Sequence, residues 1–319
     1  MIGAVLAKPG FKGISDNPRL LDILSSFSTL FLSPDFGGEE FASLPNVKFI
    51  SKTKASGYVE RFSELVSLLS AEKVDYVVTV GGDGIACYLA SAMIVEGKKS
   101  KEMILVGYPA GTANIGPIVR EGITRESLHH VRAIDGIEVK SGDKVLGYGF
   151  NDVIIANSFL GTLNNKTVNL DAFTMEEYGI AKAVTPDGRI LSPDFKVFVN
   201  GEKFSLPLDW DKIQQICVST LWQDNIAGRA VFGGVLASVG YKHPAAISFM
   251  DRIVVDSRPE NWNYRGVSTT SHVAFNENNE VVLEGLSERA HVIIDGNPFA
   301  IIDGKVSFCI HPDAVKIAF

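Results

Sequence analysis

The chain has 319 residues, enough for two domains of ordinary size, and its 46% hydrophobic and 21% charged residues exclude extensive disorder. Its 30 basic and 37 acidic residues give a net charge of −7, and no lysine or arginine cluster is dense enough to follow a nucleic-acid backbone, which excludes nucleic acid as a partner. Three separated cysteines in apolar surroundings indicate reduced core thiols in a cytoplasmic protein, and with no run of about 18 apolar residues we expect no membrane span.

The first 130 residues alternate short apolar runs with helical stretches. Residues 1–7 are apolar, lack a basic leader and are too short for a signal peptide, so we expect the first buried strand there. Further strands are expected at residues 29–32, 47–50, 77–80 and 103–106. Helices are expected at residues 18–26, 61–71 and 85–95. This alternation predicts an open parallel sheet covered on both faces, in which ligands bind at the carboxyl ends of the strands.

The rest of the chain has a different pattern. Asn200-Gly201 separates two apolar runs and predicts a hairpin, because both residues suit the positive φ angles of a type I′ turn. Strands are expected at residues 195–199, 202–206, 273–275, 280–283, 291–294, 299–302, 305–310 and 315–319, with one candidate helix at residues 226–239. We therefore expect an α/β nucleotide-phosphate domain over residues 1–130 and a β-rich substrate domain over residues 131–298, with residues 299–319 packing back on the first.

The most informative motif is Gly81-Gly82-Asp83-Gly84, which lies between the strand at residues 77–80 and the helix that follows. Glycines allow a sharp turn and leave amide N–H groups accessible to a phosphate. A carboxylate among them would repel a phosphate, unless it holds a metal ion on a nucleotide or takes a proton from a hydroxyl. The alternative is a tight strand-to-helix turn in which Asp83 caps the following helix.

A second glycine loop, at residues 107–116, follows the strand at residues 103–106. Its Gly111, Thr112 and Asn114 offer a flexible backbone, a hydroxyl and an amide, groups that hydrogen-bond phosphate or ribose. One such loop is typical of a turn, whereas two after neighbouring strands favour a nucleotide site at that edge of the sheet. Neither loop contains the G-x-G-x-x-G of dinucleotide-binding domains or the Gly-Lys-Ser/Thr of P-loops.

Together, the two loops and the β-rich remainder resemble the superfamily of NAD kinases, diacylglycerol kinases and sphingosine kinases. The resemblance covers residues 74–319. The glycine loops depart from the NAD kinase pattern in two details. Ile85 stands where that family has a small residue or threonine, and the loop at residues 109–116 is similar to the lipid-kinase form.

Two segments favour the NAD kinase branch, and a third departs from its pattern. Asn151-Asp152 resembles the Asn-Glu with which that family contacts the dinucleotide, with the shorter aspartate in place of glutamate. Asp295 lies among strands similar to the family's closing strands. Thr220 belongs to a segment that matches the family's Thr-Pro-Thr-Gly-Ser-Thr-Ala-Tyr only in part, since residues 221–225 depart from it.

The resemblance implies an α/β plus β fold, with an N-terminal open parallel α/β sheet domain and a C-terminal predominantly antiparallel β domain. It implies that the chain transfers a phosphoryl group from ATP to a ribose hydroxyl of NAD, giving NADP. Mg²⁺ is the implied second cofactor, held by the nucleotide phosphates and not by a protein cage. The habits of the superfamily also favour a homo-oligomer.

The resemblance assigns roles to residues of this chain. Asp83 is the implied base for the acceptor hydroxyl. The implied ligands of the nucleotide phosphates are Gly81, Gly82, Gly84, Gly111, Thr112 and Asn114, and those of the substrate are Asn151, Asp152, Thr220 and Asp295. Two alternatives stay open: a kinase of the same superfamily that acts on another hydroxylated small molecule or a lipid, and a non-catalytic nucleotide-binding module. The donor, ATP or polyphosphate, also stays open.

Overall fold

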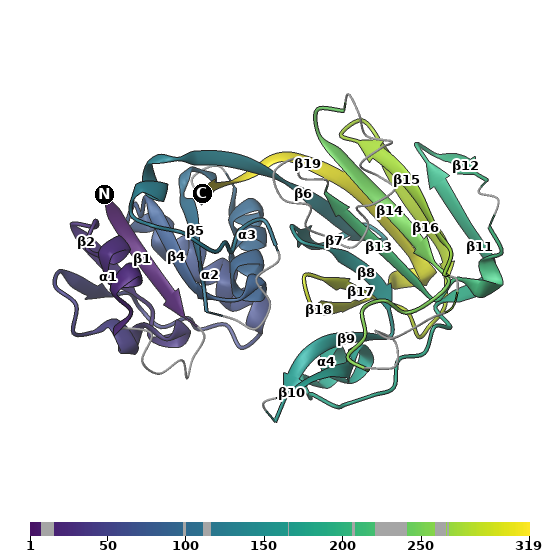
Figure 1. The fold of residues 1–319 in the computed structure, drawn as a ribbon, viewed down its shortest axis with the longest axis horizontal. Coiled ribbons are helices and arrows are strands. Elements are labelled where there is room, and N and C mark those ends of the chain that lie inside the picture. Colours follow the sequence, from purple (N-terminus) through teal and green to yellow (C-terminus); the bar gives the residue numbers. More distant parts are fainter. Residues whose placement is uncertain are drawn as a thin grey trace. The chain divides into compact units, whose positions relative to one another are not determined.

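The computed structural model describes residues 1–7, 16–97, 100–110, 116–164, 166–205, 208–220, 241–258, 266 and 268–319 (Figure 1). These residues form two compact units. Unit 1 comprises Met1–Gly136 and Asp313–Phe319, and unit 2 comprises Ile137–Pro312. The candidate helix at residues 226–239 lies outside the described residues.

Unit 1 contains a parallel sheet in the strand order β19-β5-β4-β1-β2-β3. Val78 of the central strand β4 pairs with Val5 of β1 on one side and with Val106 of β5 on the other. The central strands β1, β4 and β5 are mostly apolar and buried because a parallel sheet is covered on both faces, whereas the edge strand β3 is largely exposed. The elements before β6 are β1 (Ile2–Ala7), α1 (Pro18–Leu24), β2 (Thr29–Leu32), β3 (Val47–Phe49), α2 (Tyr58–Ala71), β4 (Tyr76–Gly81), α3 (Asp83–Glu96) and β5 (Ile104–Pro109).

The helices of unit 1 are positioned by capping and by apolar contacts with the sheet. Asn17 caps α1 by accepting the first free N–H groups of that helix, and Pro18 starts it at a position where no N–H is needed. Leu20 and Ile23 of α1 belong to the same core cluster as Val78 of β4. α3 packs against β4 and β5 and lies beside α2.

The described residues of unit 2 form antiparallel strands and one α-helix. One sheet has the order β15-β14-β13-β8-β17-β18, and every neighbouring pair in it is antiparallel. A second has the order β12-β11-β16-β19, with β6 paired to β19 and β7 paired to β6. The elements are β6 (Val131–Ser141), β7 (Lys144–Gly149), β8 (Val153–Ala156), β9 (Ser158–Leu163), β10 (Lys166–Asp171), α4 (Ala172–Tyr178), β11 (Leu191–Val199), β12 (Glu202–Phe204), β13 (Gln215–Thr220), β14 (Pro244–Met250), β15 (Thr270–Asn276), β16 (Glu280–Leu286), β17 (His291–Ile294), β18 (Asn297–Ala300) and β19 (Lys305–Ala318).

The two sheets of unit 2 share a hydrophobic core. Val153 of β8 and Val218 of β13 reach it from the six-stranded sheet, and Val281 of β16 and Phe308 of β19 reach it from the other. Because side chains alternate along a strand, the next residues face the opposite side of the six-stranded sheet. There they pack with the β9–β10 hairpin and α4 in a second cluster that includes Ile154, Phe159, Leu170, Ala172 and Cys217.

The structure has the expected fold class, an open parallel α/β sheet together with a predominantly antiparallel β part. It differs in the closing strands, because one strand, β19, replaces the two expected at residues 305–310 and 315–319. Asp313 interrupts the apolar pattern with a φ of 48°, and its N–H donates to Asp135 Oδ1 at 2.9 Å, which lets the strand continue through polar residues. The short helix α4 is also present where no helix is expected.

Among the described residues, no helix has the length and apolar character that crossing a membrane requires. In the described part of the chain, the three cysteines form no disulfide bond. Cys87 and Cys217 are buried, as expected of core thiols, whereas Cys309 is partly exposed.

Candidate functional site

In the sheet of unit 1, the order in which the chain adds strands reverses between the neighbouring strands β1 and β4. From β1 the chain continues to β2 and β3 on one side, and from β4 it continues to β5 on the other. In open α/β sheets such a switch point leaves a crevice at the carboxyl ends of the two strands, where ligands bind. Gly82 and Asp83 follow directly after β4 at that end. The strand order therefore favours the same place as the glycine motif does.

Asp83 is the first residue of α3, and its side chain is held by the segment that follows β5. Only 8% of the residue is exposed. Its Oδ2 accepts the backbone N–H of Gly116 at 3.0 Å, and the N–H of Ala110 donates to the carbonyl of Gly81 at 2.9 Å. The two predicted loops thus adjoin each other, although Gly111, Thr112 and Asn114 themselves lie outside the described residues.

The glycines of the motif do not have the backbone angles that a sharp turn would require. Gly82 is extended, with φ −95° and ψ −175°, and neither Gly81 nor Gly84 has a positive φ. Gly82 is also the N-cap of α3, so the alternative in which Asp83 caps the helix is wrong. What glycine provides at position 84 is space, because a Cβ there would meet no atom of the described residues within 4 Å.

In unit 2, three neighbouring strands of the six-stranded sheet, β13, β8 and β17, have their ends side by side at one end of the sheet. β8 is antiparallel to both β13 and β17, with Val153 paired to Val218 and to Ile294. The residues that precede β8 therefore lie beside those that end β13 and β17. This polar edge consists of Asn151, Asp152, Ser219, Thr220 and Asp295. The four predicted substrate residues are among these five.

Asp295 holds the segment that carries Asn151 and Asp152. Its Oδ2 accepts the N–H of Phe150 at 2.8 Å, and its Oδ1 accepts those of Asn151 at 2.8 Å and Asp152 at 3.0 Å. In return, the N–H of Asp295 donates to the carbonyl of Asp152 at 3.0 Å. The turn between β7 and β8 is therefore fixed to the turn between β17 and β18.

The remaining side chains of the polar edge are deeply buried. Asn151 is 9% exposed and Ser219 is 1% exposed, and Asp152 and Thr220 are buried as well. Within the described ranges, Asn151 Oδ1 and Ser219 Oγ have no hydrogen-bond partner. Buried polar atoms in native proteins nearly always have a partner, which can be a ligand or a bound water. A ligand hydroxyl at this edge would supply one.

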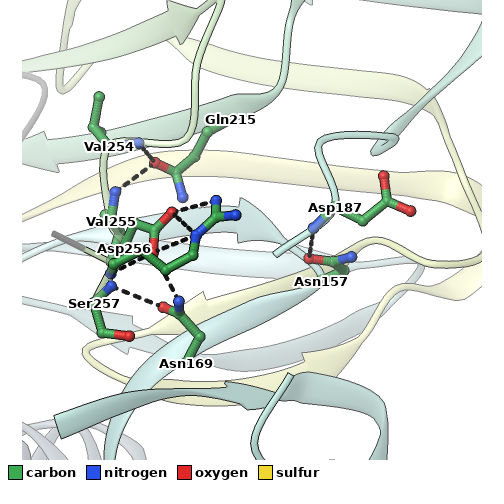
Figure 2. A network of polar contacts seen from close by, with 9 residues as sticks. Asn157, Asn169, Asp187, Gln215, Val254, Val255, Asp256 and Ser257 are labelled. Carbon is green, nitrogen blue, oxygen red and sulfur yellow. Dashed lines mark hydrogen bonds and ion pairs between the residues drawn. The ribbon is translucent and has the colours of Figure 1, made fainter. Parts of the chain in front are cut away.

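A second polar cluster lies at the opposite end of β13 and ties down the segment after β14 (Figure 2). Asn169 Nδ2 donates to Asp256 Oδ1 at 2.8 Å, and Asn169 Oδ1 accepts the N–H of Ser257 at 3.2 Å. Arg258 donates to the same carboxylate through its backbone N–H and its guanidinium. Burial of Asp256 favours its neutral form, but the hydrogen bonds from Arg258 outweigh burial and lower its pKa from 3.8 to about 2.

Gln215 extends this cluster from the first residue of β13. Its Oε1 accepts the N–H groups of Val254 at 2.9 Å and Val255 at 3.0 Å (Figure 2). Most contacts in the cluster join a side chain to backbone or pair Arg258 with Asp256, and such contacts are typical of a structural cluster. No sequence pattern indicates it, since Asn169 and Asp256 are 87 residues apart.

The described residues after β4 fit a nucleotide bound together with Mg²⁺. In such complexes Mg²⁺ takes one or two carboxylates, phosphate oxygens and water, and Asp83 supplies one buried carboxylate. The open space at Gly84 adjoins the first turn of α3, where backbone N–H groups favour anions.

The fold is that of NAD kinases, as two solved structures show. Yeast NADH kinase complexed with NADH matches with a TM-score of 0.52 and 11% identity, covering 99% of this chain and 82% of that one. An NAD kinase from Archaeoglobus fulgidus in complex with ATP matches with a TM-score of 0.50 and 13% identity, covering 100% and 94%. No family model and no curated protein sequence matches the chain. At these identities the likeness concerns the fold alone.

Proposed function

We propose that this chain is an ATP-dependent kinase that phosphorylates a ribose hydroxyl of NAD and so produces NADP. The observation that carries the proposal is Asp83, a buried carboxylate after the strand that borders the switch point. It lies beside space at Gly84 that no described residue fills. The shared fold supports it, since the two similar structures are complexes with NADH and with ATP. The Asn151-Asp152 pair at the polar edge supports NAD as the acceptor.

In unit 1, the residues after β4 take the nucleotide phosphates. The main chain at Gly82 and Gly84 approaches the phosphates, while Mg²⁺, held by phosphate oxygens, supplies charge neutralisation. Asp83 takes the proton from the hydroxyl that is phosphorylated. The N–H of Gly116 donates to Oδ2 of this carboxylate and holds the side chain in place at the N-terminus of α3.

In unit 2, the polar edge takes the acceptor. Asp152 and the Oδ1 atom of Asn151 accept hydrogen bonds from ribose hydroxyls, and the hydroxyls of Ser219 and Thr220 donate or accept. These side chains are buried, so a ligand that satisfies them gains more than it would at an exposed site, and an analogue without the hydroxyl is rejected.

The test is a phosphoryl-transfer assay with purified protein, ATP and Mg²⁺. NAD, NADH, diacylglycerol and a panel of sugars and polyols serve as acceptors, and polyphosphate replaces ATP in a parallel series. The proposal expects NAD-dependent formation of ADP together with NADP. A phosphomonoester formed only from the lipid or a polyol would show that the chain is a kinase of the alternative kind, acting on another hydroxylated small molecule or a lipid. Binding of ATP or NAD without any product would identify a non-catalytic module.

A further inference from the structure

Asp295 makes more hydrogen bonds than its place in a hairpin turn requires. Asp295-Gly296 joins β17 to β18 with φ angles of 47° and 86°, those of a type I′ turn. The hairpin between β11 and β12 has the same geometry, with φ angles of 53° at Asn200 and 79° at Gly201. The turn alone therefore needs no carboxylate, because asparagine serves equally well.

The carboxylate is needed by the neighbouring turn. Three consecutive N–H groups, those of Phe150, Asn151 and Asp152, converge on its two oxygens. Successive backbone N–H groups that point to one spot form an anion-binding concavity, and here the anion is a side chain of the same chain. An asparagine has a single acceptor oxygen and would place an NH₂ group against one of these donors.

We infer that Asp295 is a positioning residue for acceptor recognition, an inference that rests on the proposed function. Its carboxylate sets the backbone from Phe150 to Asp152 and thereby places the side chains of Asn151 and Asp152 at the polar edge. Its own oxygens are engaged by backbone donors, so it acts on the acceptor through Asn151 and Asp152 and not by direct contact.

The first experiment compares Asp295→Asn with Asp303→Asn. Asparagine keeps the turn and the side-chain volume at position 295 while removing one acceptor oxygen. We expect the Kd for NAD, measured by calorimetry, to rise about 10-fold or more, and the Kd for ATP to stay within about 2-fold. Asp303-Gly304 is a matched control with φ angles of 53° and 62°, because Asp303 is exposed and its carboxylate has no hydrogen-bond partner in the described part of the chain. Asp303→Asn should change neither constant.

A second measurement does not depend on any ligand. Backbone hydrogen exchange at Phe150, Asn151 and Asp152, followed by NMR, should become at least about 10-fold faster in Asp295→Asn and stay unchanged in Asp303→Asn. If Asp295→Asn does not fold, Asp295→Gly takes its place, since glycine suits the positive φ and carries no carboxylate.

The outcomes separate this inference from the proposed function. An unchanged Kd for NAD, or unchanged exchange at the three amides, overturns the positioning role. Wild-type protein that binds NAD without phosphorylating it overturns the kinase activity but leaves both readouts of positioning intact. Wild-type protein that does not bind NAD overturns both ideas.

Discussion

The two units each set a carboxylate among backbone N–H groups, yet the surroundings of these carboxylates differ. Asp83 starts α3, takes the N–H of Gly116 and adjoins the unfilled space at Gly84. Asp295 sits in a tight turn and takes three consecutive N–H groups. A carboxylate enclosed by backbone donors organises the chain around it, whereas one beside open space at a helix N-terminus is placed to meet a ligand. The partners of an acidic residue thus indicate whether it shapes a site or acts in it.

Replacing Asp83 tests one side of this comparison and has the largest expected effect. Asp83→Asn keeps an acceptor oxygen for the N–H of Gly116 but removes the base, so kcat for NADP formation should fall about 10²–10⁴-fold. The Kd for ATP and the thermal unfolding midpoint should stay close to those of the wild type. Near-normal turnover in this variant would remove Asp83 from the catalytic role.

Replacing Asp256 tests the other side, a carboxylate that organises structure. Its side chain is fully buried, and Asp256→Ala leaves Asn169 Nδ2 and Arg258 without their acceptor. We expect the free energy of unfolding, measured in urea, to fall by about 2–4 kcal/mol. Asp143→Ala, at an exposed position without a positive φ, should change it by less than about 0.5 kcal/mol. A stable Asp256→Ala protein would show that the cluster in Figure 2 does not organise unit 2.

The same carboxylate should make stability depend on pH in a defined window. Because the pKa of Asp256 is lowered from 3.8 to about 2 in the folded protein, the unfolded chain binds a proton there at higher pH than the folded chain does. The stabilisation is therefore complete above about pH 4 and is lost as the pH falls from about 4 to about 2. Urea titrations across this range should show a steeper loss for the wild type than for Asp256→Asn.

Asn151 should matter to binding more than to folding. Among the described residues its Oδ1 has no partner to lose, so Asn151→Ala should shift the free energy of unfolding by less than about 1 kcal/mol. The Kd for NAD should nevertheless rise about 10-fold, the equivalent of one lost hydrogen bond to a ligand. Calorimetry and urea unfolding of the same sample measure both. Loss of stability without loss of NAD affinity would reverse the interpretation of this residue.

Gly84 offers the smallest and most discriminating change. It lies in the first turn of α3 with a φ that other residues adopt, and an added methyl group meets no atom of the described residues. Gly84→Ala should therefore stabilise the fold by about 0.5–1 kcal/mol, since alanine favours helix. The methyl group takes up the space assigned to phosphate, so the Kd for ATP should rise. Tighter ATP binding in the stabilised variant would contradict a phosphate site there.

Unit 1 could be predicted from the sequence because its signals are local. Its central strands β1, β4 and β5 are mostly apolar runs, and Asn17 and Pro18 mark the start of α1. In unit 2 the same reasoning succeeds at Asn200-Gly201, which joins two paired strands. The same reasoning would join the strands on either side of Asn278-Asn279 in a hairpin. These strands, β15 and β16, belong to different sheets. Which partner a strand takes depends on core packing that the turn does not encode.

In the candidate site, too, the local motif could be predicted from the sequence and the long-range contacts could not. Gly81-Gly82-Asp83-Gly84 is recognisable because all of its chemistry lies within one turn of chain. The partnership of Asp295 with Phe150 spans 145 residues, and it depends on β8 and β17 being antiparallel neighbours in one register. No spacing in the sequence indicates such a contact. The sequence suggests Asp295 as a substrate ligand, whereas its hydrogen bonds support a different role.

Strand β19 has a consequence for how the protein is made. Its last residues complete the parallel sheet of unit 1, with Lys316 beside Ile104 and Ile317 beside Leu105, and Ala318 enters the core of that unit. A ribosome synthesises these residues only after all of unit 2, Ile137–Pro312. While unit 2 is being translated, the sheet of unit 1 therefore lacks β19, and the edge of β5 that pairs with it is exposed. Exposed strand edges invite pairing with other chains, so nascent unit 1 is the part of this protein that chaperones have most reason to protect.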